Sequence, residues 1–210
     1  MKLGISIPTY NEATNIAILL TQISEALADI SGLDTTVVVV DDNSPDGTAD
    51  IVEKAAKKLN RKGFTVTVLR RAEKDGFGRA CVAGFKNLLG AGVDYVLQMD
   101  ADLSHNPAYL PAFVKAAKDK ADFVVASRYI KGGDTPDWPL HRRLLSRYGN
   151  FYARTFLSQK VTDYTGGFNM YSAKLLQAIE LDKLRATGYG FLIELKFKAL
   201  QNARTFSEIP

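Results

Sequence analysis

Apolar and polar positions follow two alternating periods along the first 130 residues of this chain. Short apolar runs of strand length are separated by stretches with helical periodicity. The clearest run, at 35–40, is continuous and β-branched, which is typical of a strand buried on both faces. We predict strands at 3–7, 35–40, 64–69, 93–99 and 123–126, and helices at 15–30, 44–60, 78–89 and 107–118. Strands that alternate with helices in this way form a mostly parallel sheet, so the pattern predicts an α/β fold.

The helix predicted at 44–60 has a distinct start signal. Ser44 supplies a capping hydroxyl, Pro45 suits the first turn, and Asp46 places a carboxylate early in the helix. Because Ser44 already fills the capping position, the preceding Asp41 and Asp42 have no obvious structural task. Their carboxylates are therefore candidates for hydrogen bonds with a nucleobase or with ribose hydroxyls.

The pattern changes after Arg128. We predict a loop at 131–139, a helix at 140–159, a turn-rich segment at 163–168, helices at 173–179 and 191–201, and the start of a strand at 205–210. A chain of 210 residues is long enough for one α/β domain with a full core.

Composition excludes several classes of protein. The single cysteine, Cys81, excludes an internal disulfide and a four-cysteine zinc site, and the two histidines are too few for a histidine-rich metal site. No apolar run approaches the roughly 18 residues that a membrane helix needs. The N-terminus has no apolar stretch of signal-peptide length, so we expect a reducing, cytoplasmic setting.

Positive charge is concentrated in one segment. The chain carries 27 Lys and Arg against 23 Asp and Glu, a net charge of +4, and this mild excess does not indicate a nucleic-acid partner. Seven basic residues and only two acidic ones lie between 128 and 160, so this segment alone exceeds the net charge of the whole chain. We expect an anionic ligand or an anionic surface there.

Polar and acidic residues follow three of the predicted strands. The first is followed by Pro8-Thr9-Tyr10-Asn11-Glu12, the second by Asp41-Asp42, and the fourth by Asp100-Ala101-Asp102. The carboxyl ends of parallel strands share one edge of a sheet, where ligands bind. Two carboxylates one residue apart can hold a Mg²⁺ or Mn²⁺ ion, or a metal and a ribose hydroxyl. The alternative is a solvated loop or a helix cap before Pro107. Tyr10 offers a ring for stacking, or packs against the following helix.

Several common catalytic motifs are absent from the sequence. There is no G-x-x-x-x-G-K-[ST] phosphate loop, and the first strand-to-helix turn has no G-x-G-x-x-G, which disfavours ordinary kinases and dinucleotide oxidoreductases. No Gly-x-Ser-x-Gly elbow is present, and Cys81 lies in a helical pattern without a nearby histidine, so acyl-transfer catalysis is disfavoured as well.

The helix predicted at 140–159 is amphipathic and basic. On a helical wheel, one face carries Arg143, Ser146, Arg147, Asn150 and Arg154. The opposite face carries Leu144, Tyr148, Phe151, Tyr152 and Thr155. We expect the apolar face to pack on the body of the protein or to lie in a membrane interface. Arginine forks match phosphate geometry, although a solvated charged face is the alternative.

Six segments, in order along the chain, resemble one family. They are PTYNE, VVDDNSPDGTAD, QMDADLSHNP, ASRY, an Arg-x-x-Ser-x-x-x-Asn-x-x-x-Arg run and DYTGGF. Together they resemble family-2 glycosyltransferases, and more narrowly the polyprenyl- (dolichyl-) phosphate mannosyltransferases, over essentially the whole chain. The resemblance implies a GT-A (Rossmann-like) fold in one domain over 1–210, with a nucleotide-binding half at about 1–128 and an acceptor-binding half at about 129–210.

The resemblance also implies an activity. Members move a sugar from a nucleotide donor, typically GDP-mannose, to a polyprenyl phosphate, so we expect an inverting, metal-dependent hexosyltransferase with Mg²⁺ or Mn²⁺ as its cofactor. Because the acceptor phosphate is already an anion near neutral pH, this reaction needs no strong general base. We expect the protein to act peripherally at the cytoplasmic face of a membrane.

The family's functional residues are carried over to the matching positions of this sequence. The resemblance assigns the guanosine to Pro8, Tyr10, Glu12, Val40 and Asp42. It assigns the ribose, the diphosphate and the metal to Asp100, Ala101 and Asp102, with the two aspartates as metal ligands. It assigns the acceptor phosphate to Arg128, Arg142, Arg143 and Ser146. It assigns the sugar pocket to Asp163, Thr165, Gly166 and Gly167. Arg128 could reach the donor phosphates instead, and it joins the two aspartates as an expected catalytic residue.

The sequence departs from the family pattern at several positions. Relatives usually continue past Glu208-Ile209-Pro210 with another strand and a basic segment, so we expect the chain to be cut short at its C-terminus. Ser104 stands where some members have an amide near the metal, which leaves the third protein ligand open. Asn169 and Leu192 stand where relatives often carry other polar side chains, which leaves the sugar open.

Two alternatives stay open on the sequence. The same fold could use UDP-glucose or an amino-pentose donor with the same lipid phosphate, and nucleobase selection by Asp42 and its neighbours would discriminate. Alternatively, the chain is a non-catalytic module that binds a membrane surface through its basic helix. That module would bind liposomes without any response to nucleotide or metal.

The assignment of the acceptor site leads to a first prediction. Replacing Arg143 with alanine should impair use of the lipid acceptor more than it impairs nucleotide binding, because the lost guanidinium belongs to the acceptor phosphate. Acceptor-dependent turnover and nucleotide affinity, measured on the same variant, check this. Equal loss of both would mean that the acceptor site lies elsewhere.

Overall fold

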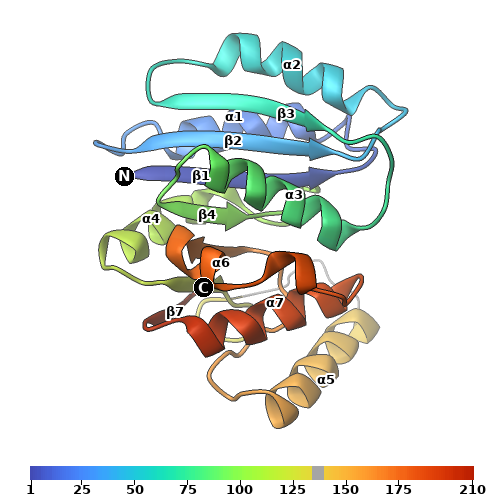
Figure 1. Ribbon diagram of the computed structural model, residues 1–210, viewed down its shortest axis with the longest axis vertical. Coiled ribbons are helices and arrows are strands. Elements are labelled where there is room, and N and C mark those ends of the chain that lie inside the picture. The colour runs from blue at the N-terminus through green and yellow to red at the C-terminus, as the bar shows by residue number, and fades with distance from the viewer. Residues whose placement is uncertain (134–139) are drawn as a thin grey trace.

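The computed structural model describes the backbone of residues 1–133 and 140–210, and their side chains except those of 140–143, 145 and 189. Within this part of the chain, seven strands form one sheet in the order β3-β2-β1-β4-β6-β5-β7 (Figure 1). The strands are β1 (Lys2–Thr9), β2 (Asp34–Asp41), β3 (Phe64–Arg70), β4 (Tyr95–Gln98), β5 (Phe123–Ala126), β6 (Asn169–Ser172) and β7 (Phe206–Ile209).

Helices cover both faces of this sheet (Figure 1). They are α1 (Ile16–Ala26), α2 (Thr48–Leu59), α3 (Phe77–Gly90), α4 (Leu110–Lys118), α5 (Leu140–Phe156), α6 (Ala173–Ala178) and α7 (Tyr189–Asn202). Two short 3₁₀ turns, η1 (Pro107–Tyr109) and η2 (Leu181–Lys183), precede α4 and α7. No described helix is both long enough and apolar enough to cross a membrane.

Strand β2 shows why both faces are covered. Its four consecutive valines are all buried, but they enter two different cores. Val37 and Val39 pack with residues of α1, α2 and α4. Val38 and Val40 pack with residues of α3, α6 and α7. Since side chains alternate between the faces of a strand, a continuous apolar run requires a helix layer on each side. The sequence-based expectation of a strand buried on both faces is therefore confirmed.

The sheet is mostly parallel, as expected, with one antiparallel strand that the sequence did not reveal. Strand β1 pairs in parallel with β2 and β4, β2 pairs in parallel with β3, and β5 pairs in parallel with β7. Strand β6 lies antiparallel between β4 and β5. Its four residues, NMYS, have no recognisable period of their own, and they become a strand only because two neighbours supply their hydrogen bonds.

The strand order reverses next to β1, between β2 on one side and β4 on the other. In open α/β sheets, ligands bind beyond the carboxyl ends of the strands at such a switch point. The carboxyl ends of β1, β2 and β4 are followed by Tyr10, Asp42 and Asp100, so the fold brings the acidic strand ends together on one edge.

The expected start of the second helix was wrong. Helix α2 begins at Thr48, after Gly47 in a left-handed conformation with φ of 83°. Asp46 lies one residue before this N-cap, and its Oδ1 accepts hydrogen bonds from the backbone N–H and the hydroxyl of Thr48. Ser44 lies outside the helix, and its hydroxyl makes hydrogen bonds with Asp41 and with the backbone of Asn11.

The predictions for the chain after Arg128 are confirmed in part. Helix α5 begins at Leu140 as predicted but ends at Phe156, three residues before Gln159. Helices α6 and α7 and strand β7 lie close to the predicted ranges. Residues 163–168 have no helix or strand, as expected. The predicted loop at 131–139 falls mostly on 134–139, which lie outside the described residues.

The close approach of α3 to the sheet leads to a second prediction. A Cβ on Gly84 would overlap the hydroxyl oxygen of Ser6 and lie 2.9 Å from Cγ2 of Val40. Gly84→Ala should therefore destabilise the protein by about 1–3 kcal/mol through overpacking. The thermal midpoint should fall by about 2–4 °C for each kcal/mol in a chain of this size.

Gly90 in the same helix provides the matched control. A Cβ there meets no atom within 4 Å, so Gly90→Ala should leave the midpoint unchanged or raise it slightly. Equal midpoints for the two variants would contradict this packing of α3 on β1.

Candidate functional site

Three carboxylates at one edge of the sheet form the centre of the candidate site. Asp42 follows β2, while Asp100 and Asp102 follow β4, and the end of β1 lies between them. We call these three residues the carboxylate edge. The charges of both Asp42 and Asp100 act on the buried Cys81 of α3, which lies beneath this edge. The residues that the sequence proposed for nucleotide and metal therefore share one end of the fold.

Asp41 has a structural task, contrary to the expectation from sequence. Its Oδ1 accepts hydrogen bonds from the hydroxyls of Ser44 and Thr9, at 2.6 and 3.3 Å, and its Oδ2 accepts from the Ser44 backbone N–H at 3.0 Å. The Ser44 hydroxyl in turn accepts from the backbone N–H of Asn11. This network ties the loop after β1 to the loop after β2, so Asp41 orders the site without facing a ligand.

Asp42 is held by an arginine that the sequence reasoning missed. Nη1 of Arg71, just after β3, donates to Oδ1 of Asp42 at 2.6 Å, and Nη2 donates to Asp75. Burial raises the pKa of Asp42, and the Arg71 charge opposes this shift. Arg71 comes two residues after the end of the strand predicted at 64–69, and this position was the available signal. This ion pair orients the Asp42 carboxylate at the carboxylate edge.

The loop after β1 presents a ring at the same edge. Tyr10 is 38% exposed, and Nζ of Lys74 lies 3.7 Å from its ring centroid, in a cation–π contact. The ring therefore offers a face at the site and is not packed into the core. Glu12 accepts a hydrogen bond from the Asn15 side chain at the entry to α1.

Two residues assigned to the nucleoside, Val40 and Pro8, have side chains that are buried or half-buried. Val40 is fully buried, packed with Cys81 and Phe85 of α3, so its side chain cannot touch a ligand. Its carbonyl accepts from the Thr9 hydroxyl. Pro8 lies beside Val40 in the β1–β2 pairing and is half-buried. The carry-over of Val40 as a contact residue thus fails for its side chain.

Asp100 sits in a cradle formed by His105 and Gly167. The Asp100 backbone N–H donates to Nδ1 of His105 at 2.9 Å, which places the proton of a neutral imidazole on Nε2, 3.6 Å from Oδ2 of Asp100. A Cβ on Gly167 would lie 3.1 Å from the same oxygen. Burial raises the pKa of Asp100, although the His105 charge opposes this, and burial lowers the pKa of His105.

Asp102 is exposed. Its Oδ1 accepts from the backbone N–H and the hydroxyl of Ser104, at 3.0 and 2.6 Å. Ser104 therefore orients the Asp102 carboxylate, which gives the serine a structural role at this position. Between them, Leu103 adopts a left-handed φ of 64°, a conformation rare outside glycine, while Ala101 is buried in the core.

The donor set suits a hard divalent cation held jointly with a ligand. Oδ1 of Asp100 is buried and has no hydrogen-bond partner among the described residues, which leaves a carboxylate oxygen for a cation. Among those residues, no group of three or more His, Cys, Asp and Glu side chains is arranged to hold a metal. Two carboxylates with phosphate and water oxygens match the usual coordination of Mg²⁺.

Arg128 is engaged by Asp163 in a bidentate ion pair. Nε and Nη2 of Arg128 donate to the two carboxylate oxygens of Asp163 at 2.6 and 2.7 Å. Burial alone would raise the pKa of Asp163, but the bonds from Arg128 and the charge of Lys196 lower it to about 2. The charge of Arg128 also acts on Asp100. The arginine is thus held in a defined orientation near the carboxylate edge.

The turn after Asp163 is ordered by its carboxylate. Oδ1 of Asp163 accepts from the backbone N–H groups of Thr165 and Gly166, at 3.2 and 2.9 Å. Asn169 donates from its side chain to the Gly166 carbonyl at 3.0 Å. Asp163 and Asn169 are fully buried, so their side chains shape this turn, and among residues 163–169 only Thr165 is not buried.

Helix α5 reaches the site through polar side chains. The Ser146 hydroxyl accepts from the Tyr129 hydroxyl at 2.7 Å and lies 3.4 Å from the Thr165 hydroxyl. Asn150 donates to Thr165 and accepts from the Tyr164 backbone N–H. The side chains of Arg142 and Arg143, which the sequence assigned to the acceptor phosphate, lie outside the described residues.

The apolar face of α5 does not pack on the body of the protein. Its large side chains are 57–70% exposed: Leu144, Tyr148, Phe151, Tyr152 and Phe156. We call these five residues the apolar ridge. The first of the two alternatives for this face was therefore wrong, because Ser146, Asn150 and Ala153 occupy the side that contacts the core.

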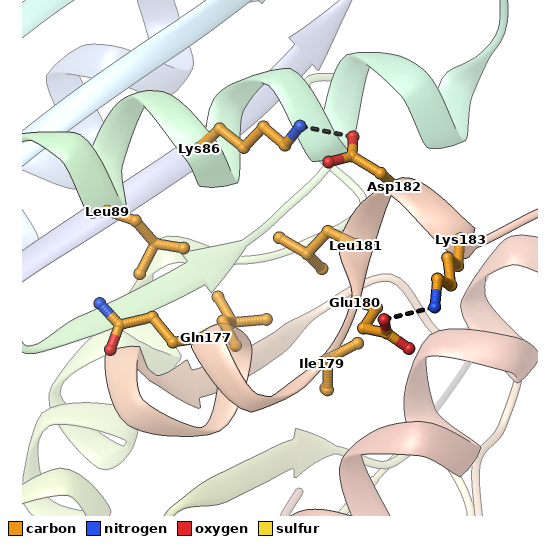
Figure 2. Close-up of a pocket in the computed structure, with 9 residues that line it drawn as sticks. Lys86, Leu89, Gln177, Ile179, Glu180, Leu181, Asp182 and Lys183 are labelled. Carbon is orange, nitrogen blue, oxygen red and sulfur yellow. Dashed lines mark hydrogen bonds and ion pairs between the residues drawn. The ribbon is translucent and has the colours of Figure 1, made fainter.

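A shallow groove elsewhere on the surface lacks this chemistry. It lies between α3 and the α6–η2 segment, and its charged groups are paired with one another, as Lys86 with Asp182 and Lys183 with Glu180 (Figure 2). Leu192, which stands where relatives often carry a polar side chain, is buried in the core. The carboxylate edge remains the candidate site.

The chain matches the model of one protein family. Residues 5–180 match the family described as Glycosyl transferase family 2. The match includes the carboxylate edge, Arg128, α5 and the turn after Asp163.

Two characterised bacterial proteins are similar along almost the whole chain. The undecaprenyl-phosphate mannosyltransferase of Micrococcus luteus is 38% identical over 204 residues, which are 97% of this chain and 80% of that protein. The polyprenol monophosphomannose synthase of Mycolicibacterium smegmatis is 35% identical over 204 residues, which are 97% of this chain and 74% of that protein.

Solved structures share the fold at low sequence identity. The glucosyl-3-phosphoglycerate synthase of Mycobacterium tuberculosis, solved with UDP, has a TM-score of 0.69 and 20% identity, and covers 99% of this chain and 69% of its own. Staphylococcus aureus TarS has a TM-score of 0.63 and 22% identity over 100% of this chain and 58% of its own. These neighbours are GT-A glycosyltransferases, so the expected GT-A fold is confirmed. The sequence and fold together show that this chain belongs to glycosyl transferase family 2.

Proposed function

We propose that this protein transfers mannose from GDP-mannose to a polyprenyl phosphate, with inversion at the sugar carbon. The observation that carries the proposal is the carboxylate edge beside an arginine fixed by Asp163, with the Ser146 hydroxyl of α5 next to the turn after Asp163. The two similar proteins named as polyprenyl-phosphate mannosyltransferases support the lipid acceptor and the sugar. Residues 1–128 would hold the donor and residues 129–210 the acceptor.

The donor would bind along the carboxylate edge. Asp42, oriented by Arg71, accepts hydrogen bonds from the nucleobase, and the exposed ring of Tyr10 stacks on it. Asp100 and Asp102 would hold a Mg²⁺ or Mn²⁺ ion together with the diphosphate. Such an ion neutralises charge that develops on the leaving diphosphate. Structural neighbours solved with Mn²⁺ and UDP support a divalent cation in this fold.

The acceptor would bind between α5 and the turn after Asp163. The hydroxyls of Ser146 and Thr165 lie on this side, and Arg128 faces it while bonded to Asp163. Arg142 and Arg143 on the same helix would add positive charge. A phosphate oxygen of the acceptor attacks the anomeric carbon from the face opposite the diphosphate, and the C–O bond to the diphosphate breaks.

The site accelerates this step by position and charge alone. The acceptor is an anion, so no residue has to remove its proton. His105 agrees with this scheme, because its Nδ1 is occupied by the Asp100 backbone N–H and its Nε2 faces the Asp100 carboxylate. The imidazole orients Asp100 and does not serve as a base.

The apolar ridge of α5 would bring the site to the cytoplasmic face of a membrane. Exposed aromatic and aliphatic side chains on a helix without any acidic residue match an interfacial helix on an anionic lipid surface. The polar side of the same helix forms part of the acceptor site. A lipid phosphate could then reach Ser146 while its chain stays in the membrane.

Turnover measurements test the proposed reaction. GDP should be released from GDP-mannose only when a polyprenyl phosphate and Mg²⁺ or Mn²⁺ are present. Asp102→Asn should lower this rate by about 100-fold, because it removes a charge that acts at the leaving diphosphate. The exposed Asp119 at the end of α4 provides the control, and Asp119→Asn should keep the wild-type rate. Absence of turnover with every polyprenyl phosphate would refute the proposal, and stronger thermal stabilisation by UDP than by GDP would move it to a UDP-sugar donor.

Vesicle binding tests the role of the apolar ridge. Phe151→Ser should weaken binding to phosphatidylglycerol-containing vesicles about tenfold, since one large side chain no longer leaves water. Ile18 on α1 is 49% exposed and lies away from α5, so Ile18→Ser should have no effect. Co-sedimentation with the vesicles measures both. The membrane assignment fails when the two variants bind alike.

A further inference from the structure

Lys196 on α7 is fully buried although it carries a long charged side chain. The surrounding positions of the helix, Phe191, Leu192, Leu195 and Ala199, are apolar and belong to the core. Burying an ammonium group is strongly unfavourable unless hydrogen bonds and opposite charges compensate for the lost water. An apolar side chain of similar size would pack well at this position, so packing of the core does not explain why a lysine is present.

The ammonium group is directed at the turn that shapes the site. Nζ of Lys196 donates to the backbone carbonyl of Asp163 at 2.6 Å, its only hydrogen-bond partner within the described part of the chain. Three charged residues act on the ammonium group: Asp163 in the turn, Arg128 just after β5, and Glu208 in β7. The Lys196 charge also acts on His105. Burial lowers the pKa of Lys196 to about 8, and the Asp163 charge opposes this shift.

Asp163 is the point where the two halves of the site meet. Its carboxylate binds Arg128 and the backbone of Gly166, while the next residue, Gly167, packs against the Asp100 carboxylate. Those bonds fix the side chain of Asp163 but not its peptide group. The peptide group between Asp163 and Tyr164 is held at both of its polar atoms: Lys196 donates to its carbonyl, and its N–H donates to Oδ1 of Asn150 at 2.6 Å.

We propose that Lys196 is a positioning residue, which tethers α7 to the Asp163 peptide and thereby holds Arg128 and the Gly166–Gly167 turn in place at the carboxylate edge. Lys196 has no exposed surface, so it acts through Asp163 and does not touch a substrate. Its effect on turnover rests on the proposed function. Its effect on the turn does not, and this allows the two to be tested separately.

Lys196→Met tests the proposal, with Lys198→Met as the matched control on the same helix. Lys198 is half-buried, and within the described residues it has no hydrogen bond or ion pair with the turn. Amide hydrogen exchange at Thr165 and Gly166 should accelerate at least tenfold in Lys196→Met, because their acceptor, Asp163, loses its tether. Exchange in α1 should stay the same. Lys198→Met should match the wild type at both places.

Kinetics with GDP-mannose and polyprenyl phosphate supply the second readout. Lys196→Met should lower kcat at least tenfold while GDP affinity stays within about twofold, since the Asp42 and Tyr10 end of the site is untouched. A merely structural role would lower the thermal midpoint and leave kcat per folded molecule unchanged. Should Lys196→Met not fold, Lys196→Leu, which also removes the N–H donor, carries the same comparison.

The outcomes separate this inference from the proposed function. Unchanged exchange at Thr165 and Gly166 overturns the role of Lys196, and so does accelerated exchange with unchanged kcat. A wild-type protein that transfers no mannose refutes the proposed function alone, and the exchange rates then decide whether Lys196 positions the turn.

Discussion

The buried ion pair between Arg128 and Asp163 connects the two parts of this molecule. Arg128 follows β5, and Asp163 lies in the turn that leads into the antiparallel strand β6. An unpaired carboxylate in that position would be strongly unfavourable, so the turn and the arginine order each other. Through Gly166 and Gly167 this order extends to Asp100. This pair of charges thus links the turn to the carboxylate edge, and Lys196 and Asn150 add hydrogen bonds to the same turn.

Charge is divided across the site in a way that suits two anionic substrates. The carboxylates collect at the ends of β2 and β4, where a cation would mediate contact with a diphosphate. The basic residues lie beyond them, after β5 and on α5. Under the proposed function, binding one anion through a cation and the other through arginines would keep two like-charged groups close together, as transfer between them requires.

Helix α5 shows how one amphipathic pattern can have two structural meanings. A wheel separates apolar from polar positions but does not say which side faces the core. Here Ser146 and Asn150 are bonded to the turn after Asp163, and the aromatic side chains are exposed. The polar side of the helix therefore faces the protein, and the apolar side is exposed. That inversion is what makes the helix suitable as a link between a lipid surface and a polar site.

Local residue patterns determined the α/β class, the parallel strands β1 to β4 and the acidic edge, because each depends on short-range periodicity and on the rule that parallel strands share their carboxyl ends. Only the tertiary structure decided which carboxylate is structural: Asp41 bonds Ser44 and Thr9, whereas Asp42 pairs with Arg71. It also decided that Leu192 is buried, that NMYS forms a strand, and that Lys196 meets Asp163. The physical reason is that these outcomes depend on partners distant in sequence, which fix burial, hydrogen bonding and orientation only when the chain has folded.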